Sequence, residues 1–384
     1  MDIISFSKHI LDHRIDRRKE HSVETIVYIA MAAVICGAES WGEIEAFGIC
    51  KKDFFARQIP SFNGIPSHDT FNRFFSSIDP AYFEREFRFW VRELCGKYEG
   101  VVAIDGKTIR GASRGDDKTP LEADRKSRFK LHMVSAWAAD NGISLGQVRV
   151  NEKSNEITAI PELIKALDLV NCIITIDAMG CQKTIAKAII EAKADYVLCV
   201  KKNQKNLLKT IEEQFNQADQ IDVTTPYYAK RYSVYTSSEK GHGRQEERQC
   251  IAYNNGLIGN TFPEWEGIQT IARIASRRKE TGEGEFSTEV RYYISSLPLD
   301  AKLIAESVRT HWSIENNLHW QLDVTFREDN TRKTNNAAQN VSVMCKMALS
   351  LLKKDTKKAS MVAKRKIAGW DEEYLARLLK TENF

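Results

Sequence analysis

Acidic residues at three places in this chain of 384 residues have the type and spacing for metal-dependent chemistry. Asp105 ends the apolar run VVAID, and Asp177 ends the apolar run CIITID. Glu315 lies in HWSIENNLHWQLDVTFRED, residues 311–329, a stretch rich in Trp, His and acids. Carboxylates at the ends of strands, joined by one from a helix, suit Mg²⁺, which prefers oxygen ligands. A pair of such ions can hold the attacking and leaving oxygens of a phosphoryl transfer.

The stretch 311–329 also offers alternatives to Glu315. Its rival third acids are Asp323, Glu328 and Asp329. The last two lie beyond the helix expected over 301–320, so Glu315 is favoured. Read as a helix, His311, Glu315 and His319 share one face, because they are four residues apart. This row is similar to a set of zinc ligands, but zinc hydrolases use the closer H-E-x-x-H spacing, which disfavours a zinc site.

The order of the expected elements predicts an α/β fold of the RNase H-like type. Three strands are followed by helix, strand, helix, strand and helix, an order that favours a mixed sheet flanked by helices. The acids fall on the first strand, the fourth strand and a late helix, as in the RNase H-like layout. We therefore predict four segments: an N-terminal helical domain (1–97), the first part of the catalytic core (98–219), a β-rich insertion (220–298), and the last part of the core with basic C-terminal helices (299–384).

Composition is that of an ordinary globular chain, with 42% hydrophobic and 28% charged residues. The most apolar run, 26–38, is too short to span a bilayer and predicts a buried helix. The N-terminus lacks the core of a signal peptide. The eight cysteines form no C-x-x-C pair, which is typical of reduced thiols. We therefore expect a cytoplasmic protein without a membrane segment.

The segment NGIPSHDTFNRFFSSIDP, residues 63–80, predicts a short amphipathic helix after a turn. Ser67 suits the N-cap, and aromatic residues follow at helical spacing from Phe71. The opposite face carries Arg73. Two interpretations stay open: a DNA recognition helix that uses Arg73, or a helix that closes a helical domain.

Long motifs in order give the chain a resemblance to the H-repeat-associated group of bacterial insertion-sequence DDE transposases. The motifs are GAESWGEIEAFG, NGIPSHDTFNRFF, VVAIDGKTIRG, TIDAMGCQKTIAKAI, YVLCVKKNQ, GHGRQEER and HWSIENNLHWQLDVTFRED. They extend over nearly the whole chain. The resemblance implies that Asp105, Asp177 and Glu315 are the catalytic triad and bind Mg²⁺, with Mn²⁺ able to substitute.

The same resemblance implies cleavage of double-stranded DNA at element ends and strand transfer into target DNA, by a homodimer on DNA. Two other functions stay open: a catalytically silent DNA-binding protein, and a nuclease of the same fold that cuts without joining. The wider relatives carry a Tyr-x2-Arg-x3-Glu-x6-Lys signature around the Glu. This chain departs from it with Val308, His311 and Leu322, and we expect His311 and His319 to take over phosphate contacts.

Several basic residues are candidate DNA contacts if the chain is a transposase. For each of them, the alternative is a solvent-exposed side chain or a structural role without DNA. The candidates are Lys107 and Arg110 after the first acid, Lys201 and Lys202 after a strand, and His242 and Arg244 in GHGRQEER. The first pair would touch the scissile phosphate. The second would follow the DNA backbone, and the third would contact DNA or a hairpin end from a turn.

Overall fold

The computed structural model describes the chain except for residues 15–18, 61, 114–129, 151–154, 221–224, 227, 242–243, 255–257, 281–285 and 382–384. Contacts divide it into two compact units. Unit 1 comprises Met1–Tyr98, Gly106–Lys153 and Ile314–Phe384, and unit 2 comprises Glu99–Asp105 and Ser154–Ser313. The domain boundaries expected at 97, 219 and 298 stay predictions. Residues 110–128 are polar, charged and Gly-containing, so the sequence predicts a loop there. Residues 110–113 instead belong to a strand, and residues 114–128 lie outside the described part of the chain.

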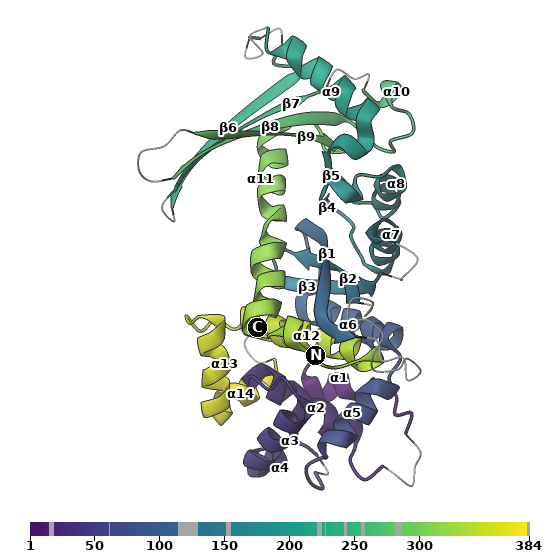
Figure 1. Ribbon diagram of the computed structural model, residues 1–384, viewed down its shortest axis with the longest axis vertical. Helices are drawn as coiled ribbons and strands as arrows, with labels where there is room; N and C mark the ends of the chain where they lie inside the picture. The colour runs from purple at the N-terminus through teal and green to yellow at the C-terminus, as the bar shows by residue number, and fades with distance from the viewer. Residues whose placement is uncertain are drawn as a thin grey trace, which may run out of the picture. The chain divides into compact units, whose positions relative to one another are not determined.

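Unit 1 is mainly helical (Figure 1). Its elements are α1 (Ile3–Lys8), α2 (Val23–Cys36), α3 (Trp41–Cys50), α4 (Lys52–Gln58), α5 (His68–Ser77), α6 (Pro80–Cys95), β2 (Lys130–Ala138), β3 (Ile143–Arg149), α12 (Asn335–Lys354), α13 (Met361–Trp370) and α14 (Glu372–Leu379). Short helical turns cover Glu315–His319, Gln321–Thr325 and Glu328–Asn330. The N-terminal helical part that the sequence predicts is therefore confirmed.

Helix α2 forms the core of unit 1. Ser22 caps its first turn by accepting a hydrogen bond from the Thr25 amide, and Gly37 ends it with a φ of 115°, a conformation that favours glycine. The run 26–35 is buried, as predicted. No single helix among the described residues is long and apolar enough to cross a membrane, and only the bent pair α2 and α3 passes that test together.

Helix α5 is amphipathic, as expected, and packs by its aromatic face. Phe71, Phe74 and Phe75 are buried. On α12, the Asn340 amide donates hydrogen bonds to the carbonyls of Phe75 and Ile78, where α5 ends. This contact satisfies carbonyls that the end of a helix leaves without partners. The buried face favours the closing-helix interpretation and leaves the DNA role of Arg73 as a prediction.

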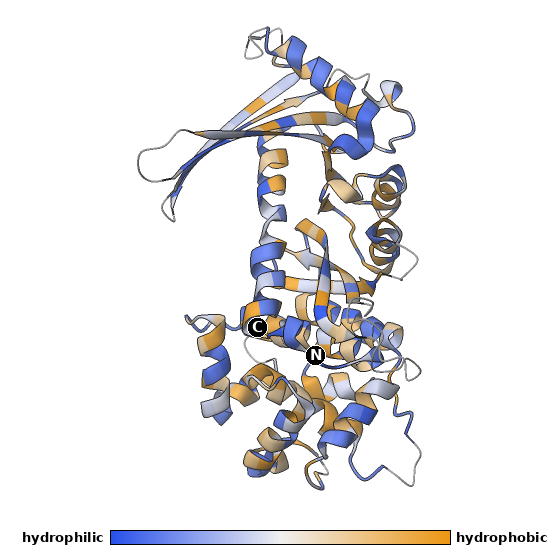
Figure 2. Cartoon of the chain, in the orientation of Figure 1, coloured by the Kyte–Doolittle hydropathy of each residue, from blue (hydrophilic) through white to orange (hydrophobic). Residues whose placement is uncertain are grey.

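Unit 2 contains a sheet flanked by helices. Its elements are β1 (Gly100–Ser113, shared with unit 1), α7 (Glu156–Ala166), β4 (Cys172–Ile176), α8 (Lys183–Glu191), β5 (Asp195–Val200), α9 (Lys205–Ala218), β6 (Tyr232–Gly241), β7 (Arg244–Tyr253), α10 (Ile258–Thr261), β8 (Thr270–Glu280), β9 (Ser287–Ser295) and α11 (Ala301–His311). Helices α7 and α8 lie on one side of β4 and β5, with α11 on the other (Figure 1). Figure 2 shows the alternating hydrophobic and hydrophilic bands of an amphipathic helix along α9.

The sheet has nine strands in the order β3-β2-β1-β4-β5-β9-β8-β7-β6. Strand β4 pairs in parallel with both β1 and β5, whereas β5 pairs with β9 in the antiparallel sense. The order of the first five strands is RNase H-like, so the predicted fold class is confirmed. Strands β6 to β9 form an antiparallel ribbon, the β-rich insertion that the sequence predicts.

An acid on α6 is buried inside unit 1. One oxygen of Glu84 accepts a hydrogen bond from the Gln147 amide of β3 at 2.7 Å. Its other oxygen is buried and has no hydrogen-bond partner among the described residues. Arg88, 3.6 Å away, is its nearest ion-pair partner. Burial raises the pKa of Glu84 from 4.5 to about 8, although the Gln147 hydrogen bond and Arg88 partly oppose that effect.

This buried carboxyl predicts a pH-dependent stability. The folded-state pKa lies above the ordinary value, so folding favours the protonated form, and stability is lost as pH rises from 4.5 to about 8. Relative to Glu84→Gln, the wild-type free energy of unfolding should fall by up to about 1.4 kcal/mol per pH unit in that window. Urea denaturation at several pH values measures it.

Glu93→Gln, an exposed position on the same helix, is the control and should follow the wild type at every pH. A difference between wild type and Glu84→Gln that stays constant with pH would contradict the assignment.

Candidate active site

The first two acids follow directly paired residues of neighbouring parallel strands. Ile104 of β1 is the register partner of Ile176 of β4, so Asp105 and Asp177 come next on both strands. Strand β4 ends there, at the edge where functional groups of α/β folds gather, whereas β1 continues past Asp105 to Ser113. Both isoleucines are buried, whereas Asp177 is exposed and Asp105 is partly buried. The structure thus places the two predicted acids at the same level of neighbouring strands, although the expected strand end at Asp105 is wrong.

A tight turn fixes the carboxylate of Asp177. Its Oδ1 atom accepts hydrogen bonds from the amides of Met179 at 2.9 Å and Gly180 at 3.3 Å. Gly180 lies so close to β4 that an added Cβ atom would meet the Ile176 side chain at 2.1 Å. Within the described residues, no hydrogen bond occupies Oδ2 of Asp177. One carboxylate oxygen is therefore held by the backbone, and the other is available for a ligand.

Two side chains that the sequence analysis did not single out hold the same turn from the neighbouring strand. The Asn203 amide donates to the Ala178 carbonyl at 2.8 Å, and the Gln204 amide donates to the Cys181 carbonyl at 3.0 Å. Both follow β5, which pairs with β4. The signal in the sequence was the amide pair in KKNQ directly after the apolar run YVLCV.

Helix α11 ends against the same strand. The Nδ1 atom of His311, its last residue, lies 3.1 Å from the hydroxyl of Thr175, two residues before Asp177. The imidazole therefore stands over β4 within unit 2. The phosphate contact expected for His311 stays a prediction.

Glu315 belongs to unit 1 and lies in an unusual helical turn. The sequence predicts an α-helix through residue 320, but the α-helix ends at His311. The amide of Trp320 bonds the carbonyl of Glu315, and the amide of Phe326 bonds that of Gln321, five residues back in each case. Residues 315–319 and 321–325 therefore form π-helical turns, which are frequent at functional sites.

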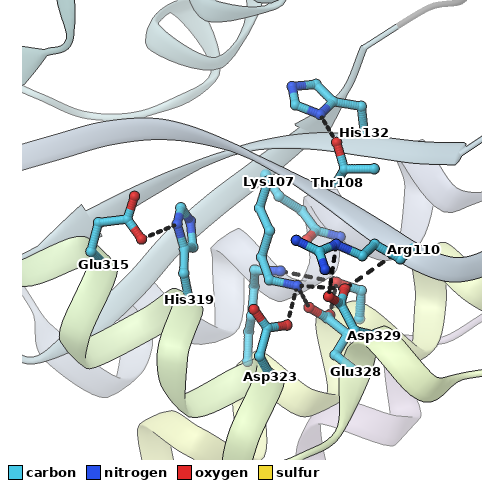
Figure 3. Close-up of polar contacts among 12 residues, drawn as sticks. Lys107, Thr108, Arg110, His132, Glu315, His319, Asp323, Glu328 and Asp329 are labelled. Carbon is cyan, nitrogen blue, oxygen red and sulfur yellow. Dashed lines mark hydrogen bonds and ion pairs between the residues drawn. The ribbon is translucent and has the colours of Figure 1, made fainter.

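Glu315 and His319 face each other across that turn (Figure 3). The Nδ1 atom of His319 lies 3.6 Å from a carboxylate oxygen of Glu315. The Glu315 side chain is about half exposed, at 52%, whereas that of His319 is buried. A buried imidazole beside an exposed carboxylate suits a group that orients the acid.

The three rival acids surround one lysine instead (Figure 3). The ammonium of Lys107 lies 2.6 Å from Asp323, 3.1 Å from Glu328 and 3.4 Å from Asp329. Burial by itself lowers the pKa of Lys107, but Glu328 and Asp323 more than offset that effect and hold the pKa above its ordinary value. The lysine is thus a permanent cation inside unit 1.

Glu328 is the most enclosed of the three acids. It accepts a hydrogen bond from the Ser342 hydroxyl at 2.7 Å, and Ser342 accepts one from Lys346 at 2.9 Å. Burial favours its neutral form, but Lys346 and Lys107 lower its pKa below the ordinary value. A buried carboxylate between two lysines is a poor metal ligand, which disfavours Glu328. The cluster also favours a structural role for Lys107, whose phosphate contact stays a prediction.

The remaining predicted DNA contacts differ in how they are placed. The side chains of Arg110 and Arg73 are 79% and 71% exposed, and each lies near one aspartate. Lys201 and Lys202 are exposed at the end of β5. His242 and the side chain of Arg244 lie outside the described residues.

The chain is similar to several known proteins. Residues 96–351 match the family model described as "Transposase DDE domain", and residues 5–91 match "DDE_Tnp_1-associated". Putative transposase YncI of Escherichia coli O157:H7 is 41% identical, over 95% of this chain and 91% of its own length. H repeat-associated putative transposase YhhI of Escherichia coli K12 is 39% identical, over 99% and 98%.

Two further similarities are more limited. Inactive transposase YbfQ of Escherichia coli K12 is 37% identical over 76 residues, which is 19% of this chain and 90% of that protein. The cryo-EM structure of a piggyBac transposase synaptic complex with hairpin DNA aligns over 99% of this chain and 77% of that chain. Its TM-score is 0.41 at 12% identity.

The ion cluster around Lys107 gives a stability prediction. Lys107→Met should lower the free energy of unfolding by about 3–5 kcal/mol, because it leaves the buried carboxylate of Glu328 without one of its cations. Chemical denaturation at neutral pH measures the change. Lys183→Met, which removes an exposed pair with Glu264, should leave the free energy of unfolding nearly unchanged, because water screens that pair.

A double variant tests the cause. Adding Glu328→Gln to Lys107→Met should recover part of the lost stability, since the stranded charge is gone. Additive losses in the double variant would show that the two side chains do not interact.

Proposed function

Since the chain belongs to the DDE transposase family, we propose that it cleaves DNA at the ends of an insertion sequence and joins the released strand to target DNA. The observation that supports this most directly is the register of β1 and β4. That register pairs Ile104 with Ile176, the residues directly before Asp105 and Asp177. Double-stranded DNA is the proposed substrate, and a homodimer on DNA would pair the two ends.

The chemistry of the donors fits a divalent metal ion. Asp177 keeps one oxygen on backbone amides, its other oxygen accepts no hydrogen bond from the described residues, and Asp105 is partly buried on the neighbouring strand. Hard cations such as Mg²⁺ and Mn²⁺ bind carboxylates of this kind. Bound there, such ions would supply charge stabilisation for an in-line phosphoryl transfer.

Glu315 is the proposed third carboxylate. It follows His311 by four residues, and the His311 imidazole is bonded to Thr175 of β4. The three rival acids are engaged by Lys107, which makes Glu315 the better candidate. His319 beside it would orient the carboxylate. His311, Arg110, Lys201 and Lys202 are the proposed phosphate contacts. His311 is hydrogen-bonded to Thr175 of β4, and the three cations are exposed.

Replacing Asp177 tests the catalytic proposal. On a plasmid that carries the coding sequence with its native flanking DNA, the wild type in Mg²⁺ or Mn²⁺ should give end cleavage and joined strands. Asp177→Asn should lower cleavage more than about a hundredfold. Loss of a residue that only supports a metal ligand lowers activity by up to about a hundredfold. Asp177 is proposed as a ligand itself, so its loss should have a larger effect. DNA binding by gel shift should be unchanged.

The control is Glu213→Gln, an exposed acid of α9 that pairs only with Lys209 among the described residues. Equal inactivity of wild type and Asp177→Asn, with both binding DNA, would make the chain a catalytically silent DNA-binding protein. Cleavage without joined products would make it a nuclease.

The amides after β5 give a second prediction. Asn203→Ala should lower cleavage by about 10–100-fold, because the turn that carries Asp177 loses the hydrogen bond to Ala178. The Mn²⁺ concentration needed for half-maximal cleavage should rise, while DNA affinity stays the same. Asn206→Ala, exposed on the next turn, is the control.

Asn203→Gln should restore part of the activity, since it keeps the donor. An unchanged Mn²⁺ requirement in Asn203→Ala would show that this residue does not position Asp177.

A further inference from the structure

The ribbon of β6 to β9 has two faces, which differ in how far their charged side chains form ion pairs. Alternate residues of a strand point to opposite faces, so the strand registers sort its side chains. One face carries Cys250, Ala272 and Tyr293, which pack with Ala301 and Ile304 of α11. The other carries Arg273 and Tyr292, which contact α9. Figure 1 shows both helices near one end of the ribbon and the strands extending beyond them.

On the α11 side, the charges beyond the helix neutralise one another. Buried Glu246 lies 2.6 Å from Arg248 and 2.7 Å from Arg278. Glu239 lies 2.9 Å from Arg309 of α11. The arginine side chains of this face that the structure describes are therefore bound to carboxylates within unit 2.

On the α9 side, Arg273 is paired with Asp219 at 2.6 Å, whereas the cations farther along the strands have no carboxylate partner among the described residues. Continuing by twos from Arg273, β8 places Arg277 and Lys279 on this face. The register Lys279↔Gln245↔Lys240 adds Lys240 of β6. Among the described residues, none of these three cations forms an ion pair. The one acid of the face, Glu247, accepts a hydrogen bond from Gln245 at 3.0 Å instead.

An aromatic ring holds two of these cations without cancelling their charge. The guanidinium of Arg277 lies 5.0 Å and the ammonium of Lys279 lies 5.9 Å from the centre of the Phe286 ring. A cation–π contact orients a cation but leaves its full positive charge. Their neighbours are short polar side chains that can donate and accept hydrogen bonds, including exposed Thr236, Ser238 and Gln249.

We propose that the α9-side face of the ribbon, formed by Thr236, Ser238, Lys240, Gln249, Arg277 and Lys279, binds the phosphate backbone of a DNA duplex. Residues two apart on a strand are about 7 Å apart, and a duplex carries a negative charge every ~1.7 Å along its axis. The phosphates are thus spaced more closely than the cations, so each cation can lie near a phosphate in many registers of the duplex. Such contacts fix position and carry no sequence information. The inference rests on the proposed function for its choice of polyanion.

The salt dependence of DNA binding by the full chain tests this surface. The probe is a short DNA duplex of arbitrary sequence, and fluorescence anisotropy follows its binding over a range of salt concentrations. The triple variant Lys240→Gln, Arg277→Gln, Lys279→Gln should bind more weakly at low salt. Its slope of log K against log salt should become shallower by about 0.9 for each phosphate that the protein no longer neutralises.

A matched triple variant removes the same formal charge from ion-paired residues. It is Arg278→Gln, Lys302→Gln, Arg309→Gln, whose cations pair with Glu246, Glu306 and Glu239. Its slope should stay close to that of the wild type. A third variant, Lys240→Arg, Arg277→Lys, Lys279→Arg, keeps the charges and should bind as the wild type does. Equal melting temperatures exclude misfolding as the cause of any weaker binding.

Equal slopes for the two charge-removing triple variants would overturn the inference. So would a weakening confined to double-stranded RNA, or an absence of DNA binding by the wild type. Cleavage is measured separately: Asp177→Asn should keep the wild-type slope. Failure of the catalytic proposal is thereby distinguishable from failure of this one.

Discussion

The parallel pairing of β1 with β4 is the constraint on which the candidate site depends. Side chains alternate along a strand, so a shift of one residue would turn every side chain of β1 to the other face. The pairing of Ile104 with Ile176 therefore decides that Asp105, within β1, lies level with Asp177 at the end of β4. Burial of the two isoleucines fixes the register of β1 against β4. That register in turn sets the positions of Asp105 and Asp177. The same strand β4 bears Thr175, which the His311 imidazole contacts.

An ion-pair network holds the second half of β1 inside unit 1, to which it belongs. Lys107 lies among three carboxylates, and Glu328 connects it through Ser342 to Lys346 inside α12. Burying charges costs several kcal/mol for each ion unless partners compensate. An apolar cluster of the same volume is often as stable or more so, so this network is better understood as specifying geometry. Ion pairs and hydrogen bonds require particular distances and directions, so the network favours one arrangement of β1 and α12. Apolar side chains would pack in several arrangements.

The alternating pattern of the ribbon strands builds an apolar core near α11 and carries charged and polar side chains farther out. Near α11 its alternate residues are apolar and complete a core, which anchors the strands. Farther out the alternation continues with charged and polar residues. There the α11-side face cancels its charge internally, as Glu246 does with two arginines. Charges that are already paired contribute little to recognition of a partner. The difference between the faces therefore lies in pairing, since both carry cations.

The sequence by itself determined most of the elements and the position of Asp177 directly after a buried strand. Apolar runs such as CIITI and YVLCV specify buried strands locally, and an acid directly after such a run marks the edge of a sheet. The amphipathic stripe from Phe71 likewise predicted the buried face of α5. These features depend on neighbours within a few residues, so periodicity and capping reveal them.

Only the tertiary structure decided which polar groups meet. Lys107 is separated from Glu328 by 221 residues, and Asn203 from Ala178 by 25, and no local pattern records such pairings. The π-helical turns from Glu315 were likewise hidden, because a spacing of four residues is compatible with an α-helix as well. The sequence offered Lys107 as a phosphate contact and Glu328 as a rival ligand. The fold brings them together, because a buried charge is stable only where a distant part of the chain supplies its partner.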